Sequence, residues 1–211
     1  MTEVVQGSPE WHVLRLGKVT ASRVADVIAK TKTGWGTSRA NYLAELIAER
    51  LTGEPAATFT NAAMQRGTDK EPDARAAYEF RTDVEVALVG FVDHPEILMT
   101  GASPDGLVGD EGLIELKCPN TATHIDTLLG EEIPAKYITQ MQWQMACTGR
   151  QWCDFVSFDP RLPEAMRIFI RRIQRDAEKI ASLEKEVSIF LRELDGKVAA
   201  LQQRYEQKAA A

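Results

Sequence analysis

The chain has 211 residues, of which 44% are hydrophobic and 27% charged, and its formal net charge is −6. This length suffices for one domain with a sizeable core, and the composition is typical of a soluble globular protein. The acidic balance argues against a protein that coats nucleic acid through a uniformly basic surface, but a locally basic DNA track is compatible with it.

The sequence carries no sign of export or membrane insertion. No apolar run approaches the roughly 18–20 residues that span a bilayer, and the N-terminus lacks the basic-then-apolar pattern of a secretion signal. The three cysteines, Cys118, Cys147 and Cys153, are widely spaced, and no CxxC pair is present. These features favour reduced thiols over a disulfide framework or a zinc or iron–sulfur site. We therefore expect a cytoplasmic protein with no membrane partner.

Helical patterns come first along the chain. One helix is expected to begin at a cap at Thr20 or Ser22, and a second at a cap at Ser38. A third, more polar helix is predicted from about residue 62 to 80, with a kink or break near Glu71 because Pro72 lies within it. The apolar faces of the first two helices are Val24, Val27 and Ile28, and Tyr42, Leu43, Leu46 and Ile47.

Strand patterns follow, and a long helical pattern ends the chain. Five segments have strand character, namely residues 84–89, 97–102, 113–118, 152–158 and 166–171. Helices are predicted over about 135–148 and 176–207, and the second has Ile180, Leu183, Val187, Phe190, Leu191 and Leu194 on one face. Strands enclosed by helices predict a single mixed α/β (α+β) domain over residues 1–211, with a central mixed sheet and a helical C-terminal extension.

One predicted hairpin combines two carboxylates and a lysine. Asp105 precedes the turn at residues 109–112, and Glu115 and Lys117 follow it in the next strand. Side chains alternate along a strand, so Glu115 and Lys117 share one face while Ile114 and Leu116 face the core. Closing the hairpin places Asp105 across from them. Two carboxylates near an ammonium suit Mg²⁺, which prefers oxygen ligands and also binds substrate phosphate.

The same pattern has a structural alternative. A Glu and a Lys two residues apart often form a charge pair on a solvated strand, and only the addition of Asp105 makes the two interpretations equally weighted. Upstream, Glu71 is either one charge on a polar helix or a third carboxylate of the site. Downstream, Gln140 and Gln144 share a helix face at i, i+4. They are either surface amides or groups that hold a water at the site.

Several short motifs occur in order along nearly the whole chain. They are Trp11-His12-x-x-Arg15-x-Gly17-x-x-Thr20-Ala21-Ser22, Gly67-x-x-x-Glu71, Ser103-Pro104-Asp105-Gly106, Glu115-Leu116-Lys117-Cys118-Pro119, Gln140-x-Gln142 and Asp159-Pro160-Arg161. Each is weak alone, but their joint order resembles the YqaJ-type viral recombinases, the lambda-exonuclease-like branch of the PD-(D/E)XK nucleases. The resemblance implies a PD-(D/E)XK core of the restriction-endonuclease type.

The resemblance also implies a metal site. Asp105, Glu115 and the carbonyl of Leu116 would bind one Mg²⁺, and Glu71 with Asp105 would bind a second. Mn²⁺ is expected to substitute for Mg²⁺. Lys117 would assist the attacking water, with Gln140 nearby.

Further residues match positions that contact DNA in the family. Arg15, Ser22 and Ser103 would form a pocket for a 5′-phosphate, Met64 would act as a wedge at the terminal base pair, and Trp11 would stack on nucleic acid. Without the resemblance, Arg15 is a surface charge, Ser22 a helix cap, and the two apolar side chains core residues.

The implied activity is 5′-to-3′ digestion of one strand of double-stranded DNA, leaving a 3′ single-stranded tail for recombination. The resemblance further implies a ring-shaped homotrimer, a single-strand annealing protein as partner, and a phage or prophage protein acting in a bacterial host cell. Two departures are visible: residues 119–124 lack an expected arginine, and the segment between Asp93 and Ser103 is longer. The alternatives are an endonuclease with the same core and a catalytically inactive DNA-binding scaffold.

Overall fold

The computed structural model describes residues 4–56, 62–130 and 132–209 of the chain. Its helices are α1 (Pro9–Arg15), α2 (Val24–Val27), α3 (Thr37–Thr52), α4 (Ala62–Thr82), α5 (Thr121–Gly130), α6 (Ala135–Thr148) and α7 (Ala177–Ala209), with 3₁₀ turns η1 (Ala21–Arg23) and η2 (Glu164–Met166). Its strands are β1 (Val19–Thr20), β2 (Lys30–Thr31), β3 (Gly34–Trp35), β4 (Val86–Ala87), β5 (Val92–Asp93), β6 (Thr100–Ala102), β7 (Gly106–Val108), β8 (Gly112–Lys117), β9 (Trp152–Phe158) and β10 (Ile168–Gln174).

A five-stranded mixed sheet has the order β10-β9-β8-β7-β4. β8 lies in its middle and is parallel to β9 and antiparallel to β7. Residues 112–116 are all buried, because helices cover both faces of this central strand. α4 packs through Ala74 and Tyr78 on the face that carries Ile114 and Leu116. α6 packs on the opposite face, where Met141 and Met145 meet Leu113.

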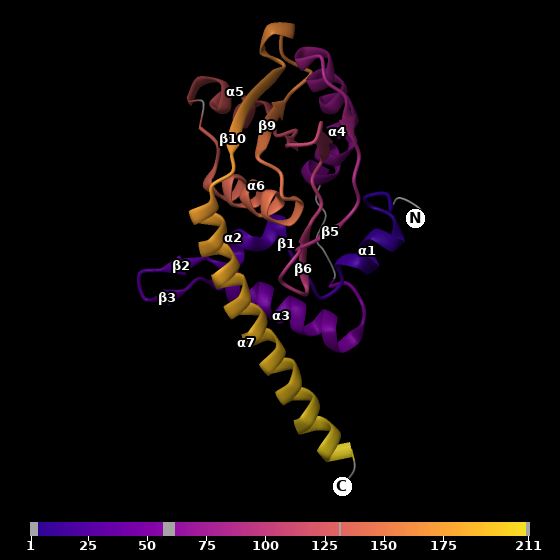
Figure 1. The fold of residues 1–211 in the computed structure, drawn as a ribbon, viewed down its shortest axis with the longest axis vertical. Coiled ribbons are helices and arrows are strands. Elements are labelled where there is room, and N and C mark those ends of the chain that lie inside the picture. The colour runs from indigo at the N-terminus through magenta and orange to yellow at the C-terminus, as the bar shows by residue number, and fades with distance from the viewer. Residues whose placement is uncertain (1–3, 57–61, 131, 210–211) are drawn as a thin grey trace.

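A second core lies beside this sheet, where α7 crosses α2, α3 and α6 (Figure 1). The predicted apolar face of α7 is confirmed, since all six of its predicted residues are buried. Phe190 stacks on Tyr42 of α3 with ring centroids 5.8 Å apart. The first half of α7 is therefore part of the core, whereas its C-terminal end projects beyond the rest of the chain (Figure 1). None of the helices in the described ranges combines the length and apolarity needed to span a bilayer.

A small parallel pairing joins the N-terminal segment to the middle of the chain. β1 pairs with β6 in the register Val19↔Thr100 and Thr20↔Gly101. The Thr100 hydroxyl donates to the carbonyl of Val19 at 2.7 Å. These contacts fix the points where β1 and β6 end, and the candidate site lies just beyond them.

The predicted helix caps are confirmed only in part. Thr20 occupies the N-cap position of the 3₁₀ turn at residues 21–23, which leads into α2, but its side chain makes no cap hydrogen bond. α3 begins at Thr37 after Gly36, so Ser38 lies inside its first turn. The expected break near Glu71 is also wrong. α4 continues through Pro72 because its second half packs on the sheet, and this packing outweighs the loss of one backbone hydrogen bond.

Four of the five predicted strands have different bounds, although β8, predicted over residues 113–118, is displaced by only one residue. Of residues 84–89 only β4 pairs, because its partner β7 is itself three residues long. Of residues 97–102 only the last three are strand, because Met99 has a φ of 61° and interrupts the extended backbone. β10 begins at Ile168, after Met166 in the η2 turn. The helices α1 and α5 were not predicted.

Candidate active site

The β7–β8 hairpin brings Asp105 next to Glu115. Its register runs Val108↔Gly112, Leu107↔Leu113, Gly106↔Ile114, so the following pair is Asp105 and Glu115. The pairing of β7 stops at Gly106, and the Leu116 backbone N–H instead donates to Asp105 Oδ2 at 2.6 Å. The predicted placement of Asp105 across from residues 115–117 is confirmed.

Glu115 is a fully buried carboxylate in the central strand, and three side chains satisfy it. Its Oε1 accepts from the Lys117 ammonium and from Gln140 Nε2, the latter at 2.7 Å. Its Oε2 accepts from Gln144 Nε2 at 2.6 Å. A buried charge needs such partners. The predicted shared face of Gln140 and Gln144 is therefore confirmed, and that face points at Glu115.

Glu71 adds a third carboxylate from α4, which packs on β8. Burial raises the pKa of Asp105 well above its ordinary value, and the negative charges of Glu115 and Glu71 raise it further, against an opposing effect of Lys117. Burial likewise raises the pKa of Glu71, which Lys117 lowers and Glu115 raises. Three carboxylates thus interact electrostatically around one ammonium.

Lys117 remains a cation in this setting. Burial lowers the pKa of Lys117, but the carboxylates of Glu115 and Asp105 outweigh that effect and leave the pKa raised. The ammonium also lies 5.1 Å from the centroid of the Tyr137 ring. A lysine with a raised pKa is a poor proton acceptor, so this group suits orienting water and stabilising negative charge.

A second group of predicted residues meets where β1 and β6 end. β1 leads into the η1 turn, which contains Ser22, and β6 is followed directly by Ser103, so both serines lie just beyond the paired residues. Both serines line a small cavity of about 150 Å³ together with Arg15 and Asp105. The structure therefore brings together Arg15, Ser22 and Ser103, as predicted, and places them next to a carboxylate of the hairpin.

Trp11 organises this cavity from α1. Its indole N–H donates to the Ser103 hydroxyl at 2.9 Å, and its ring lies under the Arg15 guanidinium, 3.7 Å from the centroid. Burial lowers the pKa of Arg15, although the charges of Tyr42 and Glu49 act to raise it. In the described part of the chain Arg15 has no ion-pair partner. A poorly solvated guanidinium with a free edge suits an anion.

A larger cleft of about 750 Å³ continues from the small cavity, and Ser22 and Gln140 line both. Glu71, Lys117, and Lys136 and Tyr137 at the start of α6 are among the residues that line this cleft. The carboxylate–lysine site thus lies where the small cavity, which contains Arg15, meets the larger cleft.

Comparisons with known proteins show the family and the fold of the chain. The family model of the YqaJ-like viral recombinase domain matches residues 10–151, a range that includes both the carboxylate–lysine hairpin and the small cavity. The chain belongs to the YqaJ-like viral recombinase family. Among curated proteins, none matches the chain.

Solved structures extend the likeness of this YqaJ-like recombinase to its fold. An alkaline exonuclease (LHK-Exo) from Laribacter hongkongensis is 57% identical, with a TM-score of 0.89 over 95% of this chain and 99% of that one. LHK-Exo has also been solved in complex with dAMP, with the same similarity. A phage-related exonuclease from Haemophilus somnus 129PT shares the fold, with a TM-score of 0.72 at 20% identity over 87% of this chain and 96% of that one. The mixed α/β fold is the PD-(D/E)XK-like fold of these exonucleases, as the sequence predicts.

The donor set of this YqaJ-like recombinase fits a hard divalent cation in part. Carboxylates and a backbone carbonyl are the ligands that Mg²⁺ and Mn²⁺ take. The N–H and C=O of one strand residue point to the same side, so the carbonyl of Leu116 faces the side of Asp105. Yet across the described ranges no three His, Cys, Asp or Glu side chains lie close enough to hold one ion together. Mg²⁺ commonly uses one or two carboxylates plus water and substrate phosphate, and this set supplies that minimum.

Four more residues bear on the candidate site, namely Trp11, Met64, Gln144 and Tyr137. Trp11 lies at the small cavity, where it contacts Ser103 and Arg15, and its stacking on nucleic acid stays a prediction. Met64 belongs to α4, but its side chain falls outside the described part of the structure, so the wedge remains a prediction. Gln144 was considered only as an amide that could hold a water, whereas it donates to Glu115, and Tyr137 was not predicted as a site residue. The i, i+4 spacing signals Gln144, whereas nothing local signals Tyr137.

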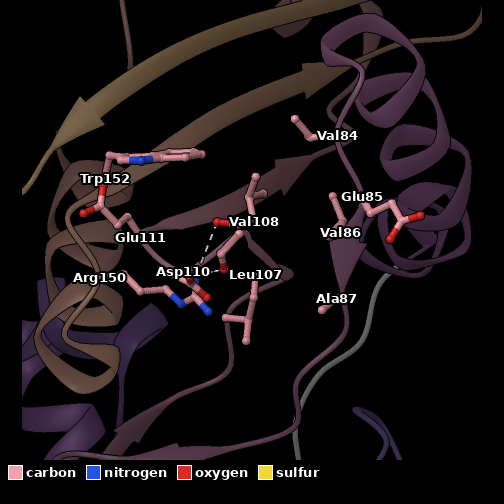
Figure 2. Close-up of a pocket in the computed structure, with 11 residues that line it drawn as sticks. Val84, Glu85, Val86, Ala87, Leu107, Val108, Asp110, Glu111, Arg150 and Trp152 are labelled. Carbon is pink, nitrogen blue, oxygen red and sulfur yellow. Dashed lines mark hydrogen bonds between the residues drawn. The ribbon is translucent and has the colours of Figure 1, made fainter.

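Another hollow, of about 900 Å³, lies at the β4 edge of the sheet (Figure 2). Figure 2 shows residues 84–87 on one side of it and Trp152 and Arg150 on the other. Arg150 donates to the carbonyls of Gly109 and Gly112 at 2.7 and 2.8 Å, so its hydrogen bonds stabilise the hairpin turn. This hollow holds none of the predicted site residues, and its one cation is structural. The volume of a hollow therefore does not by itself identify the candidate active site of this recombinase.

Proposed function

We propose that the chain is a divalent-metal-dependent exonuclease that digests the 5′-ended strand of linear double-stranded DNA and leaves a 3′ single-stranded tail. One observation carries this proposal. Asp105 lines the same small cavity as Arg15, Ser22 and Ser103, so an anion held there lies beside the carboxylates and lysine that would act on the next phosphodiester. Membership of the family and 57% identity to an alkaline exonuclease support it.

Each residue of the site has a separate role in this proposal. Arg15 would pair with the terminal 5′-phosphate, and the two serines would hold its remaining oxygens. Asp105, Glu115 and the Leu116 carbonyl would hold one Mg²⁺ or Mn²⁺, and Glu71 with Asp105 a second. When bound, such an ion supplies a Lewis acid and a water of lowered pKa.

Lys117 would act on the scissile phosphate itself. Its ammonium would orient the attacking water and offset the charge that develops on the phosphate, and Gln140 would hold that water in place. Electrostatic stabilisation of this kind needs donors that are already in position, and the contacts of Lys117 with Glu115 and Tyr137 provide that.

Assembly and partner follow from the family resemblance. We expect a ring-shaped homotrimer that encloses the duplex and passes the 3′ tail to a single-strand annealing protein. Sedimentation of the purified chain tests the first expectation. A mass corresponding to a monomer at all concentrations contradicts it without affecting the nuclease proposal.

The decisive experiment uses a linear duplex labelled separately at its 5′ and 3′ ends, with Mg²⁺, Mn²⁺ or EDTA. The expected result is release of the 5′ label as a mononucleotide, only with metal, while a circular duplex stays intact. A Lys117→Ala protein controls for contaminating nuclease. Nicking of the circle would indicate an endonuclease, early release of the 3′ label would reverse the polarity, and complete inactivity would favour a DNA-binding scaffold.

A further inference from the structure

Gln144 is the one contact of the Glu115 carboxylate that faces away from the cleft. The two donors to Oε1, Lys117 and Gln140, both line the cleft, whereas Gln144 does not. Gln144 is itself fully buried, and it donates to Oε2 at 2.6 Å. The Glu115 carboxylate therefore has one oxygen bonded to two side chains that line the cleft and one oxygen bonded to a side chain of the core.

The Gln144 amide has a second neighbour on the side away from Glu115. Its Oε1 accepts from the Cys153 thiol, with the sulfur 4.0 Å away. Cys153 lies on β9, paired in register with Leu113 of β8, and burial raises the pKa of its thiol, so it stays protonated and able to donate. The opposite amide orientation would set an oxygen against the Glu115 carboxylate and an N–H against the thiol hydrogen.

We infer that Gln144 is a positioning residue for the metal site: with the Cys153 thiol behind it, it fixes the plane of the Glu115 carboxylate so that Oε1 faces Lys117 and Gln140, which line the cleft. The inference rests on the proposed function. Groups behind a ligand orient it, and their loss typically lowers metal affinity about 10- to 100-fold.

A purely structural role is the competing explanation, because any buried carboxylate needs donors. Gln142 offers a matched control on the same helix. It is also buried, its Nε2 donates to the Gln174 carbonyl at 2.8 Å, and its Oε1 accepts from the Asp176 backbone N–H at 2.9 Å. It makes as many hydrogen bonds as Gln144 but contacts no residue of the site.

The test compares wild type with Gln144→Met and Gln142→Met, since methionine keeps the volume and removes the amide. Mn²⁺ binding is measured by calorimetry without DNA, thermal unfolding is measured without metal, and cleavage is measured across Mn²⁺ concentrations. We expect both variants to unfold earlier. Only Gln144→Met should bind Mn²⁺ about 10- to 100-fold more weakly, and its cleavage should recover largely at high Mn²⁺.

The outcomes separate this inference from the proposed function. If wild type binds Mn²⁺ and Gln144→Met binds it equally well, Gln144 is structural and the inference is wrong. An equal weakening in Gln142→Met contradicts it as well. If wild type itself binds no Mn²⁺, the proposed function fails. Should Gln144→Met not fold, Cys153→Ala releases the amide more gently, and a weakening of Mn²⁺ binding without a change in Gln142→Met supports the same conclusion.

Discussion

Replacing Arg15 with alanine removes the one guanidinium of the small cavity that Ser22 and Ser103 line. The Trp11 ring 3.7 Å from the Arg15 carbon covers one face of this group, and burial shields it from water. A charge-assisted hydrogen bond in such a place contributes about 1.5–3 kcal/mol. Because about 1.4 kcal/mol corresponds to a factor of ten, kcat/KM on 5′-phosphorylated ends should fall about 10- to 100-fold.

The assay compares duplexes with 5′-phosphate and 5′-hydroxyl ends for each protein. A 5′-hydroxyl end cannot use the guanidinium, so its rate should change much less and the preference between the ends should shrink. Arg23→Ala is the control, because Arg23 also stacks on an aromatic ring, Tyr42 at 4.0 Å, but its fork pairs with Asp26. An Arg15→Ala protein that keeps the full preference, or a wild type without one, refutes the 5′-phosphate role of the cavity.

Four other predictions test separate parts of the structure. Lys117→Ala should lower the cleavage rate about 10²- to 10³-fold while calorimetry still detects metal binding; near-normal turnover contradicts the role. Asp105→Ala should weaken metal binding itself, and unchanged binding of both ions by calorimetry rules out the two-ion assignment. Hydrogen bonding by Arg161 lowers the pKa of Asp159 to about 2. The ionised Asp159 therefore stabilises the fold above the ordinary pKa of 3.8, and this contribution is lost as the pH falls toward 2. Acid titration of Asp159→Asn should lack that loss, which is of order 1 kcal/mol because Arg161 is half exposed. Phe190→Ala should lower the free energy of unfolding by about 3–5 kcal/mol in chemical denaturation, and a loss below 1 kcal/mol would mean that α7 is dispensable to the core.

The features that the sequence predicts well depend on local periodicity. α6 and β9 have the predicted bounds, because each is a continuous pattern that ends at a turn. The hairpin was predictable because Gly109, with a φ of 50°, and Gly112 mark its turn and fix which residues pair. Once that register is known, Asp105 must lie near Glu115.

The features that the sequence does not predict depend on contacts between distant segments. The caps at Thr20 and Ser38 follow the usual residue preferences, but the tertiary contacts of residues 17–24 and 34–37 set the helix starts. α4 continues through Pro72 because of packing that local rules cannot see. The cavity depends on a parallel pairing between residues 81 positions apart, which no periodicity reveals. Arg15 and Ser22 could therefore be assigned to one site only through the family resemblance.

The two halves of the site are built by two different strand pairings that a short connection joins. The parallel pair β1–β6 places Ser22 beside Ser103, and the antiparallel pair β7–β8 places Asp105 beside Glu115. Ser103 and Asp105 are two residues apart, so their Cα atoms lie at most about 7 Å from each other. That separation is comparable with the step between neighbouring phosphates of one DNA strand. A strand whose terminal phosphate is held by the first half would therefore present its next phosphodiester to the second half, which favours release of one nucleotide at a time.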